Sequence, residues 1–354
     1  MKAGGDIRPA IRHLVLWLTT DCNLSCAYCY RGQPSGRAVM SRETMAAALE
    51  LAAHGDRPFK VQLAGGEPTL EPDLMEFAAR EVRRRGWPAT LAVQTNGVSL
   101  TRDLAEMLRR RRIQAGVSLD GPWRAHESLR GRFAETMHGL EALEQAGVDF
   151  GVTAVVSAEN VGKLSGLATL LSRFRHARGL GLDLLVRRGH AEDGWPRMAE
   201  PEALREAMQE LARAVAWINQ RRTPPLVLRE LERIKNGGGV FCQAALGGSL
   251  AVHPNGSLYP CGQTMGDEDL CLGSLQRPDF SKMAALGRYE LGSGHCAGCR
   301  LEGRCPGECP SRLKYNGDQG RELSCAMWQG LALGLGNDQA NHWQTSEEQG
   351  HAAA

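Results

Sequence analysis

The alternation of β-rich runs with amphipathic helical stretches between about residues 13 and 187 restricts the fold more than any other feature of the sequence. Strands are predicted at residues 13–19, 59–65, 90–96, 113–120, 149–157 and 180–187. Helices are predicted between these strands near residues 41–54, 71–86, 101–112, 133–146 and 160–176. Strands that are joined through helices usually pair in parallel. The pattern therefore predicts an α/β fold, either doubly wound or an incomplete barrel.

Unusual polar sequences follow each of the first four predicted strands. They are CNLSCAYC (22–29), GGEP (65–68), QTNG (94–97) and SLDG (118–121). In parallel α/β folds, ligands bind beyond the carboxyl ends of the strands. The four stretches therefore predict a single site on one rim of the sheet.

The eleven cysteines form two blocks separated by about two hundred cysteine-free residues. No apolar run approaches the ~18 residues of a membrane span, and the N-terminus has no hydrophobic signal-peptide stretch. We therefore expect a soluble, cytoplasmic protein whose thiols serve metal binding or catalysis rather than disulfides. The net charge of +2 gives no reason to expect nucleic acid or a membrane as a partner.

The first block, Cys22, Cys26 and Cys29, is one thiol short of a closed tetrahedral site. Three thiolates on one loop can hold a zinc ion with an open position or an iron–sulfur cluster with an open iron. Structural zinc sites usually bring their ligands on two separated hooks, and no second Cys-x2-Cys follows within ~40 residues. The compact spacing therefore favours a cluster with a vacant iron.

The loop CNLSCAYC resembles the cluster-binding loop of the radical S-adenosylmethionine (SAM) superfamily. The resemblance covers about residues 1–190, where GGEP, QTNG and SLDGPWRAHESLR follow in order. It implies a partial (β/α)6 TIM-like barrel and a [4Fe–4S] cluster held by Cys22, Cys26 and Cys29. It also implies that Tyr28 lies near the adenine and that the glycine-rich motif receives the methionine amino group. The implied SAM contacts are Tyr28, Gly65, Gly66, Glu67, Ser118 and Arg130.

The second block resembles, in seven cysteines, the SPASM extension of radical SAM enzymes that modify peptides and proteins. The resemblance implies two auxiliary [4Fe–4S] clusters, which makes three clusters in all. The implied ligands of the outer cluster are Cys296, Cys299, Cys305 and Cys325. Those of the inner cluster are Cys242, Cys261 and Cys309. Two structural zinc sites are the alternative that composition alone leaves open.

The inner cluster lacks a fourth assigned thiolate, because QAALGGS (243–249) contains no cysteine. Either Cys271 completes it, or its fourth iron is open to substrate and Cys271 is merely buried. A second departure concerns the proton acceptor of sulfatase maturases, an aspartate directly after the cysteine of Gly-x4-Cys. Gly262 occupies this position here, which argues against formylglycine formation and leaves the catalytic base unassigned. The nearby acidic stretch 267–269 is as well explained as a solvated turn.

The expected organisation is a radical SAM core (1–195), a bridging helix and linker (196–239), a SPASM domain (240–335) and a polar tail (336–354). Helices are expected near 200–220 and 323–334. The resemblance implies an enzyme that cleaves SAM to a 5′-deoxyadenosyl radical and modifies a ribosomally made peptide or protein by cross-linking, thioether formation or a related oxidation. The alternatives are a dehydrogenase of a small-molecule cofactor or antibiotic pathway and a non-catalytic iron–sulfur carrier or scaffold. Expected partners are the peptide, a flavodoxin- or ferredoxin-like electron donor and, if a leader is read, a separate leader-recognition protein.

Overall fold

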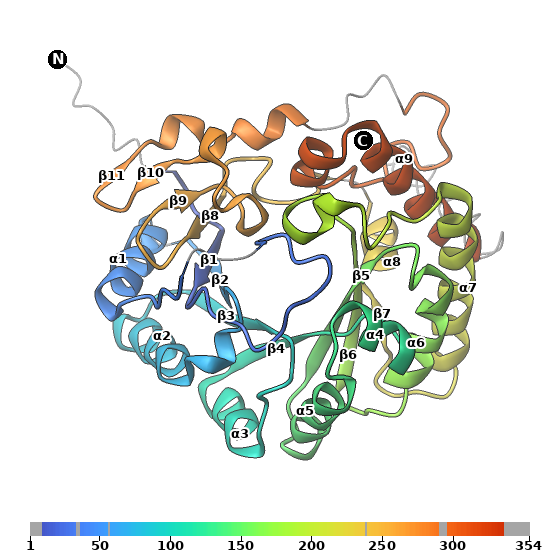
Figure 1. Ribbon diagram of the computed structural model, residues 1–354, viewed down its shortest axis with the longest axis horizontal. Helices are drawn as coiled ribbons and strands as arrows, with labels where there is room; N and C mark the ends of the chain where they lie inside the picture. The colour runs from blue at the N-terminus through green and yellow to red at the C-terminus, as the bar shows by residue number, and fades with distance from the viewer. Residues whose placement is uncertain (1–8, 33–35, 56, 238, 290–295, 336–354) are drawn as a thin grey trace, which may run out of the picture.

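A nine-stranded sheet curves around the centre of the molecule in the computed structural model (Figure 1). The structure describes residues 9–32, 36–55, 57–237, 239–289 and 296–335, so the predicted polar tail lies outside it. Strands β1 to β6 run parallel in chain order, and β7 extends the sheet beyond β6. Beyond β1 lie β8, which is parallel to β1, and β9, which is antiparallel to β8. The strands are β1 His13–Trp17, β2 Phe59–Ala64, β3 Ala89–Thr95, β4 Ile113–Ser118, β5 Phe150–Val156, β6 Ala177–Leu184, β7 Val227–Leu228, β8 Ser249–Val252 and β9 Leu258–Tyr259.

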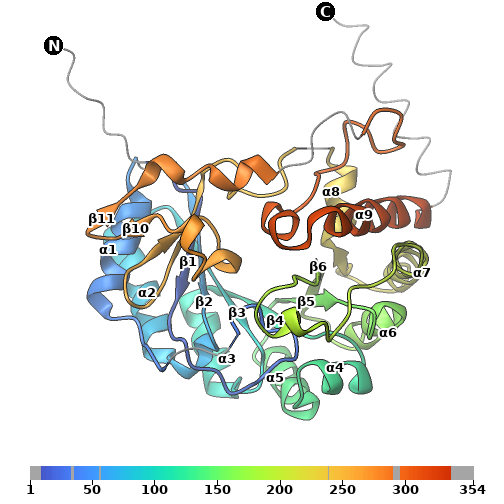
Figure 2. The ribbon, with the colours of Figure 1, turned by 45° about the horizontal axis from the view of Figure 1, so that its top comes forward.

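Helices cover the outside of the curved sheet, as Figures 1 and 2 both show. Local sequence fixes several of their ends: Ser41 and Thr101 each accept a hydrogen bond from a backbone N–H of the first turn, and Gly86 ends α2 in the left-handed conformation. The helices are α1 Arg42–Ala53, α2 Pro72–Arg85, α3 Arg102–Arg111, α4 Trp123–Leu129, α5 Phe133–Gln145, α6 Leu164–Leu171, α7 Pro201–Asn219, α8 Arg229–Lys235 and α9 Pro310–Gly334. A small hairpin, β10 Gly273–Ser274 with β11 Arg277–Pro278, lies beside β9.

Side chains of β1 alternate between two hydrophobic layers, as expected of a strand with both faces covered. Leu14 and Leu16 pack in the large core between the sheet and its helices. Val15 and Trp17 belong to a second cluster with Met265 from the cysteine-rich half of the chain. The concave face of the sheet is therefore partly filled by residues that come from far along the sequence.

The α/β class and all six strands predicted between residues 13 and 187 are confirmed, and the incomplete barrel is the form that the sheet takes. The sequence did not predict β7, β8 or β9, because runs of two to four residues carry little periodicity. The expected short helix near 323–334 is wrong in length. Helix α9 spans 25 residues with non-helical dihedral angles at Gly317, and it packs along α7. No helix in the described part of the chain is both long and apolar enough to cross a membrane.

Candidate active site

The first cysteine loop begins after β1 and lies over the centre of the curved sheet, at the carboxyl ends of the parallel strands (Figure 1). Its three thiols are half-buried and unpaired in disulfides. The loop is held by its own turns, since the N–H of Cys29 donates to the carbonyl of Cys26 at 3.1 Å. It is also held from outside, because the N–H of Ala27 donates to the carbonyl of Leu129 at 2.9 Å. This loop is the first of the four polar motifs that were predicted to lie together on one rim of the sheet.

Gly65 and Gly66 press directly against the backbone of the cysteine loop. A Cβ atom at Gly65 would lie 2.5 Å from the carbonyl oxygen of Thr19, and one at Gly66 would lie 1.8 Å from that of Asp21. The N–H of Gly66 donates to Thr19 and that of Glu67 donates to Asp21, both at 2.8 Å. The glycines were expected to let the backbone approach a ligand. The approach that the structure shows is to the cysteine loop, and a contact with SAM stays a prediction.

The Glu67 side chain is buried, with 1 % of its surface exposed, and ties the end of β2 to the end of β3. Its Oε1 accepts hydrogen bonds from the hydroxyls of Thr69 and Thr95, both at 2.6 Å, and Oε2 accepts from the N–H of Asn96 at 2.7 Å. Burial raises the pKa of Glu67, and these hydrogen bonds act in the opposite direction. Oε2 has the larger remaining capacity to accept a hydrogen bond, because Oε1 also accepts from the N–H of Thr69.

Asn96 connects the QTNG motif to the first cysteine. Its Nδ2 donates to Oδ1 of Asn23 at 2.7 Å and lies 3.9 Å from the sulfur of Cys22. In the same motif Gln94 donates to the hydroxyl of Ser118 at 3.0 Å. The three motifs that follow β1, β3 and β4 therefore meet, as predicted for one rim.

Arg130, Asp120 and Tyr28 form a buried group beneath the second cysteine. The guanidinium of Arg130 donates to Asp120 at 2.8 Å, lies 5.1 Å above the ring of Tyr28 and approaches the sulfur of Cys26 at 3.9 Å. The hydroxyl of Tyr28 donates to the same carboxylate. The Asp120 side chain is fully buried and holds Arg130 in place. Burial raises the pKa of Cys26 to about 11, whereas Arg130 acts to lower it.

His126 lies four residues before Arg130, a helical spacing that suggests an exposed pair, but the structure buries it fully in the last turn of α4. Its Nδ1 accepts the N–H of Asp120 at 3.4 Å, its ring packs edge-on against Phe133, and its Nε2 has no hydrogen-bond partner. Burial first, and Arg130 second, lower the pKa of His126 to about 4. The imidazole therefore stays neutral in the folded protein at ordinary pH.

Lowering the pH is expected to destabilise the protein through His126. The unfolded state, with a histidine pKa near 6.5, takes up a proton that the folded state refuses until about pH 4. The contribution is complete above pH 6.5 and is lost as the pH falls toward 4. Between pH 7.5 and 5.0 the free energy of unfolding should fall by about 2 kcal/mol more in the wild type than in His126→Gln. Urea unfolding at both pH values tests this, and equal pH dependence of the two proteins would contradict it.

In the second block, the thiols of two sets of cysteines influence one another's pKa. After burial, the charges that most raise the pKa of Cys261 include those of Cys309 and Cys242. Burial raises the pKa of Cys305 to about 11, and Cys325, Cys296 and Cys299 add to the shift. The thiols within each set are thus close enough for the charge of one to affect the pKa of another. Which groups they bind stays a prediction.

Thiols are the donors that both iron–sulfur clusters and structural zinc take, and the cysteines in the described part of this chain are not paired in disulfides. Within the described residues, no group of three or more His, Cys, Asp or Glu side chains converges as a single ion would require. Tetrahedral zinc at 2.3 Å from sulfur would bring the thiolates to roughly 3.8 Å from one another. A cubane cluster is wider, because each thiolate binds a different iron. The choice between clusters and zinc in the second block stays a prediction, which iron and zinc analysis tests.

Cys271 and the acidic turn that follows Gly262 are both held by neighbouring protein groups. The thiol of Cys271 faces the carbonyl of Gly273 at 3.8 Å, and a role as cluster ligand stays a prediction. Asp267 is not a solvated turn residue, since it accepts from the hydroxyl of Tyr315 at 2.7 Å and pairs with Lys314 at 3.2 Å. At Gly262 an added Cβ would lie 3.7 Å from Nε1 of Trp17.

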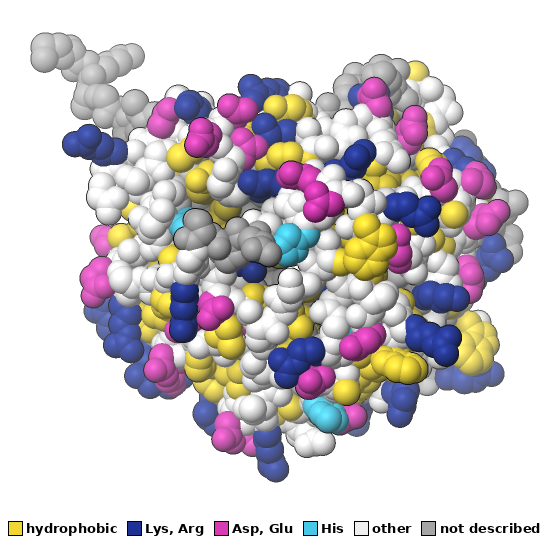
Figure 3. All heavy atoms as spheres, in the orientation of Figure 1, with side chains coloured by type: hydrophobic (Ala, Val, Ile, Leu, Met, Phe, Trp, Pro, Cys, Tyr) yellow, Lys and Arg dark blue, Asp and Glu magenta, His cyan; other side chains and the backbone are white. Residues whose placement is uncertain are grey.

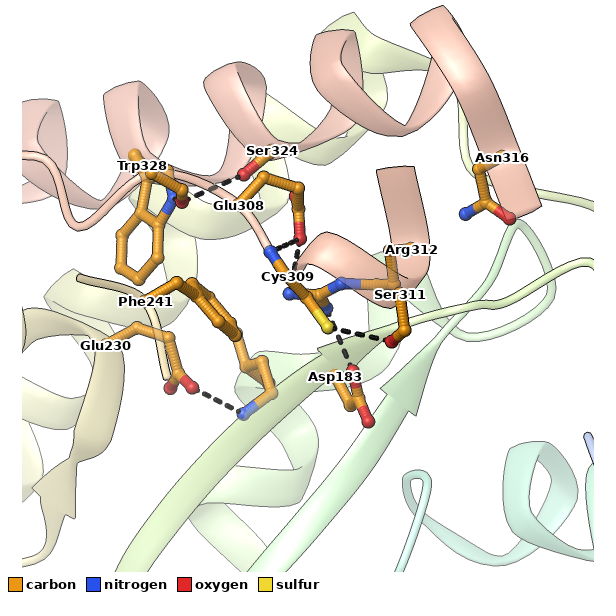
Figure 4. Close-up of polar contacts among 12 residues, drawn as sticks. Asp183, Glu230, Phe241, Glu308, Cys309, Ser311, Arg312, Asn316, Ser324 and Trp328 are labelled. Atoms are coloured by element: carbon orange, nitrogen blue, oxygen red, sulfur yellow. Dashed lines mark hydrogen bonds and ion pairs between the residues drawn. The ribbon is translucent and has the colours of Figure 1, made fainter. Parts of the chain in front are cut away.

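Sequence reasoning missed a buried charge network beside Cys309 (Figure 4). Arg312, 1 % exposed, pairs with Glu308 at 2.6 Å and with Asp183 at 2.9 Å, and its guanidinium lies 5.2 Å from the ring of Phe241. Burial raises the pKa of Glu308, and Arg312 opposes this rise. Asp183 lies one residue before the end of β6 and is partly exposed, so the network reaches from a predicted ligand of the inner cluster to the mouth of the barrel. Only proximity in space identifies these residues, since no local motif marks them.

Comparison with known proteins identifies the first half of this site. The family model for the radical SAM superfamily matches residues 18–171, which include the cysteine loop and the motifs after β2, β3 and β4. The chain carries a radical SAM domain. Membership of the radical SAM superfamily implies a [4Fe–4S] cluster and SAM as cofactors, and Cys22, Cys26 and Cys29 stay the predicted ligands of the cluster.

Relatives of this radical SAM protein are similar over most of its length. The mycofactocin maturase MftC of Mycobacterium ulcerans (strain Agy99) is 26% identical over 328 residues, which cover 85% of this chain and 83% of MftC. The antilisterial bacteriocin subtilosin biosynthesis protein AlbA of Bacillus subtilis (strain 168) is 23% identical over 85% of this chain and 70% of AlbA.

The fold of the radical SAM protein is shared with a solved structure of native anSMEcpe with bound AdoMet and the Kp18Cys peptide. The TM-score is 0.75 at 18% identity, with 94% of this chain and all of that chain covered. The likeness extends past the matched domain into the cysteine-rich half. The two proteins therefore share a fold over both halves of this chain, not over the matched domain alone.

Proposed function

We propose that the protein is a radical SAM enzyme that modifies a ribosomally made peptide or protein. The cysteine loop after β1, held by backbone hydrogen bonds against Gly66 and Glu67, is the observation that carries the proposal. When bound, a reduced [4Fe–4S] cluster supplies the electron that cleaves SAM to methionine and a 5′-deoxyadenosyl radical, which abstracts hydrogen from the substrate.

The residues of the first half have distinct proposed tasks. Cys22, Cys26 and Cys29 would hold the cluster, with SAM at the remaining iron. Arg130 and Glu67 would contact the charged groups of the methionine moiety, and both are already fixed by buried hydrogen bonds. Such fixed groups bind a ligand without a further loss of side-chain freedom. The full set of proposed SAM contacts is Tyr28, Gly65, Gly66, Glu67, Ser118 and Arg130.

We assign the second half, residues 240–335, as a SPASM domain with two auxiliary clusters that follows the core (1–195) and a bridge (196–239). The grouping of the thiols supports this assignment. The proposed inner ligands are Cys242, Cys261 and Cys309, with Cys271 as the candidate fourth. The proposed outer ligands are Cys296, Cys299, Cys305 and Cys325. The inner site lies beside Asp183 at the end of β6, where it would face a substrate in the barrel mouth.

A peptide substrate is favoured over a small molecule by the relatives that align over both halves. MftC is named a maturase and AlbA a bacteriocin biosynthesis protein, and each covers 85% of this chain. On the face shown in Figure 3, acidic and basic side chains are interspersed, so peptide recognition there would not depend on one sign of charge. A flavodoxin- or ferredoxin-like donor, a leader-recognition protein and a cytoplasmic location stay predictions.

Anaerobic reconstitution tests the proposal in two steps. We expect about twelve irons per chain, and dithionite-reduced protein should convert SAM to 5′-deoxyadenosine. Peptides encoded next to the gene should then lose mass in units of hydrogen or form a cross-link, detected by mass spectrometry. Absence of 5′-deoxyadenosine would overturn the proposal that the protein is a radical SAM enzyme. Cleavage of SAM with every neighbouring peptide unchanged would favour the small-molecule alternative. About four irons with two zinc ions per chain would overturn the assignment of two auxiliary clusters to the second half.

A further inference from the structure

Residues 188–190 contact both cysteine sites from one short segment that follows β6. They begin the single turn Gly189–Asp193, which lies between the first cysteine loop and the segment 261–265 of the cysteine-rich half. Because three consecutive residues contact two different sites, this short stretch of backbone links the hydrogen bonds made to one site with those made to the other. We call residues 188–190 the strap.

The first end of the strap is Arg188, which holds the segment that carries Cys261. Its guanidinium donates to the carbonyl of Gln263 and, at 2.7 Å, to that of Met265. The same guanidinium lies 5.2 Å from the ring of Tyr315, whose hydroxyl binds Asp267. Two charge-assisted hydrogen bonds from one planar group fix both the position and the orientation of the segment.

The second end of the strap holds the first cysteine loop. The N–H of His190 donates to the carbonyl of Cys29 at 3.0 Å, and its Nδ1 donates to that of Cys26 at 3.0 Å. Gly189 has a positive φ of 62°, and a Cβ atom there would lie 2.4 Å from the carbonyl oxygen of Cys29 and 2.5 Å from the nitrogen of Gly32. The loop and the strap therefore touch backbone to backbone.

We infer that the strap is a positioning element that makes the order of each cysteine site depend on the other. Arg188 transmits through Gly189, the single residue between the two ends, because the backbone of Gly189 packs against the carbonyl oxygen of Cys29. Under the proposed function, which this inference deepens, the strap keeps the SAM site and the inner cysteine site at a fixed separation on either side of the substrate. Coupling of this kind is reciprocal, so a loss of contacts at either end of the strap should also loosen the segment held by the other end.

Hydrogen exchange of the anaerobically reconstituted full chain, followed by mass spectrometry, tests the inference. In Arg188→Ala, exchange should rise about tenfold not only in peptides that cover 258–268 but also in those that cover 22–32, which Arg188 does not touch. In His190→Ala, the rise should extend in the opposite direction, from 22–32 to 258–268. Arg188→Lys should recover part of the protection, because an ammonium can still donate to the carbonyl groups.

The matched control is Arg187→Ala, since the Arg187 side chain is exposed and the residue's hydrogen bond to Asn316 comes from the backbone. It should leave exchange in both segments at the wild-type rate. Increases confined to the segment next to each substitution, or equal increases in Arg187→Ala, would overturn the inference. The readout needs no substrate and no turnover. A protein that failed to cleave SAM but showed the crossed exchange pattern would reject the proposed function and retain the strap.

Discussion

Replacement of Gly66 by alanine is expected to destroy the first cysteine site and to leave the cysteine-rich half in place. The added Cβ would lie 1.8 Å from the carbonyl oxygen and 2.5 Å from the carbonyl carbon of Asp21. Both are backbone atoms, so the overlap is relieved only if the cysteine loop moves away. That movement breaks the hydrogen bonds from Gly66 to Thr19 and from Glu67 to Asp21.

The expected cost of Gly66→Ala is about 3 kcal/mol of unfolding free energy or more, since a packed backbone accommodates extra volume poorly. Reconstituted protein should lose about four of about twelve irons per chain and all SAM cleavage. Iron analysis, urea unfolding and 5′-deoxyadenosine assay measure the three effects. The control is Gly162→Ala, where an added Cβ meets nothing within 4 Å. Full iron content and cleavage in Gly66→Ala would show that the loop is not packed as described.

The second large effect is expected at Arg312, whose cation balances two carboxylates beside Cys309 (Figure 4). Arg312→Met removes that cation and leaves Glu308, fully buried, without a charged partner. Removal of one partner from a buried ion pair costs about 3–5 kcal/mol, because the remaining charge has lost its solvation and its counterion. The midpoint of urea unfolding should fall accordingly.

A double variant separates this electrostatic cost from lost packing. Glu308→Gln combined with Arg312→Met removes both charges, and it should be more stable than Arg312→Met alone by about 1–3 kcal/mol. Asp318→Asn is the surface control on the same helix, because the Asp318 side chain is 85% exposed in its pair with Arg321 and should change stability by less than about 1 kcal/mol. If the double variant were no more stable than the single one, the cost would lie in packing.

Much of the first half could be read from the sequence because its signals are local. Alternation predicted the six parallel strands, and most of the helices between them, to within a few residues, whereas α4 was not predicted. Motifs at strand ends predicted one site, since parallel topology brings those ends together. The resemblance to the SPASM extension implied two sets of cysteines in the second half, and their assignment to two clusters stays a prediction.

What the sequence could not supply depends on contacts between distant residues. Nothing near Asp183 indicates that Arg312, 129 positions later, will neutralise it. The strap was missed for the same reason, because Arg188 and His190 belong to no motif. The role of Gly66 was only half predicted: the need for glycine was clear, but its neighbour is the cysteine loop. His126 was the reverse case, since its helical spacing from Arg130 suggested an exposed pair and the structure buries it.

Strand β8 has a consequence for how the chain can be divided. It pairs with β1 along four residues, from His13 with Ser249 to Leu16 with Val252, and β1 leads directly into the first cysteine loop. A fragment that stopped before β8 would leave the backbone groups of that side of β1 without partners, as an open edge suited to aggregation. The two halves are therefore not interchangeable modules. A chimera that exchanges the cysteine-rich half must carry over a strand that matches β1, or it will lose the support of the first cysteine loop as well.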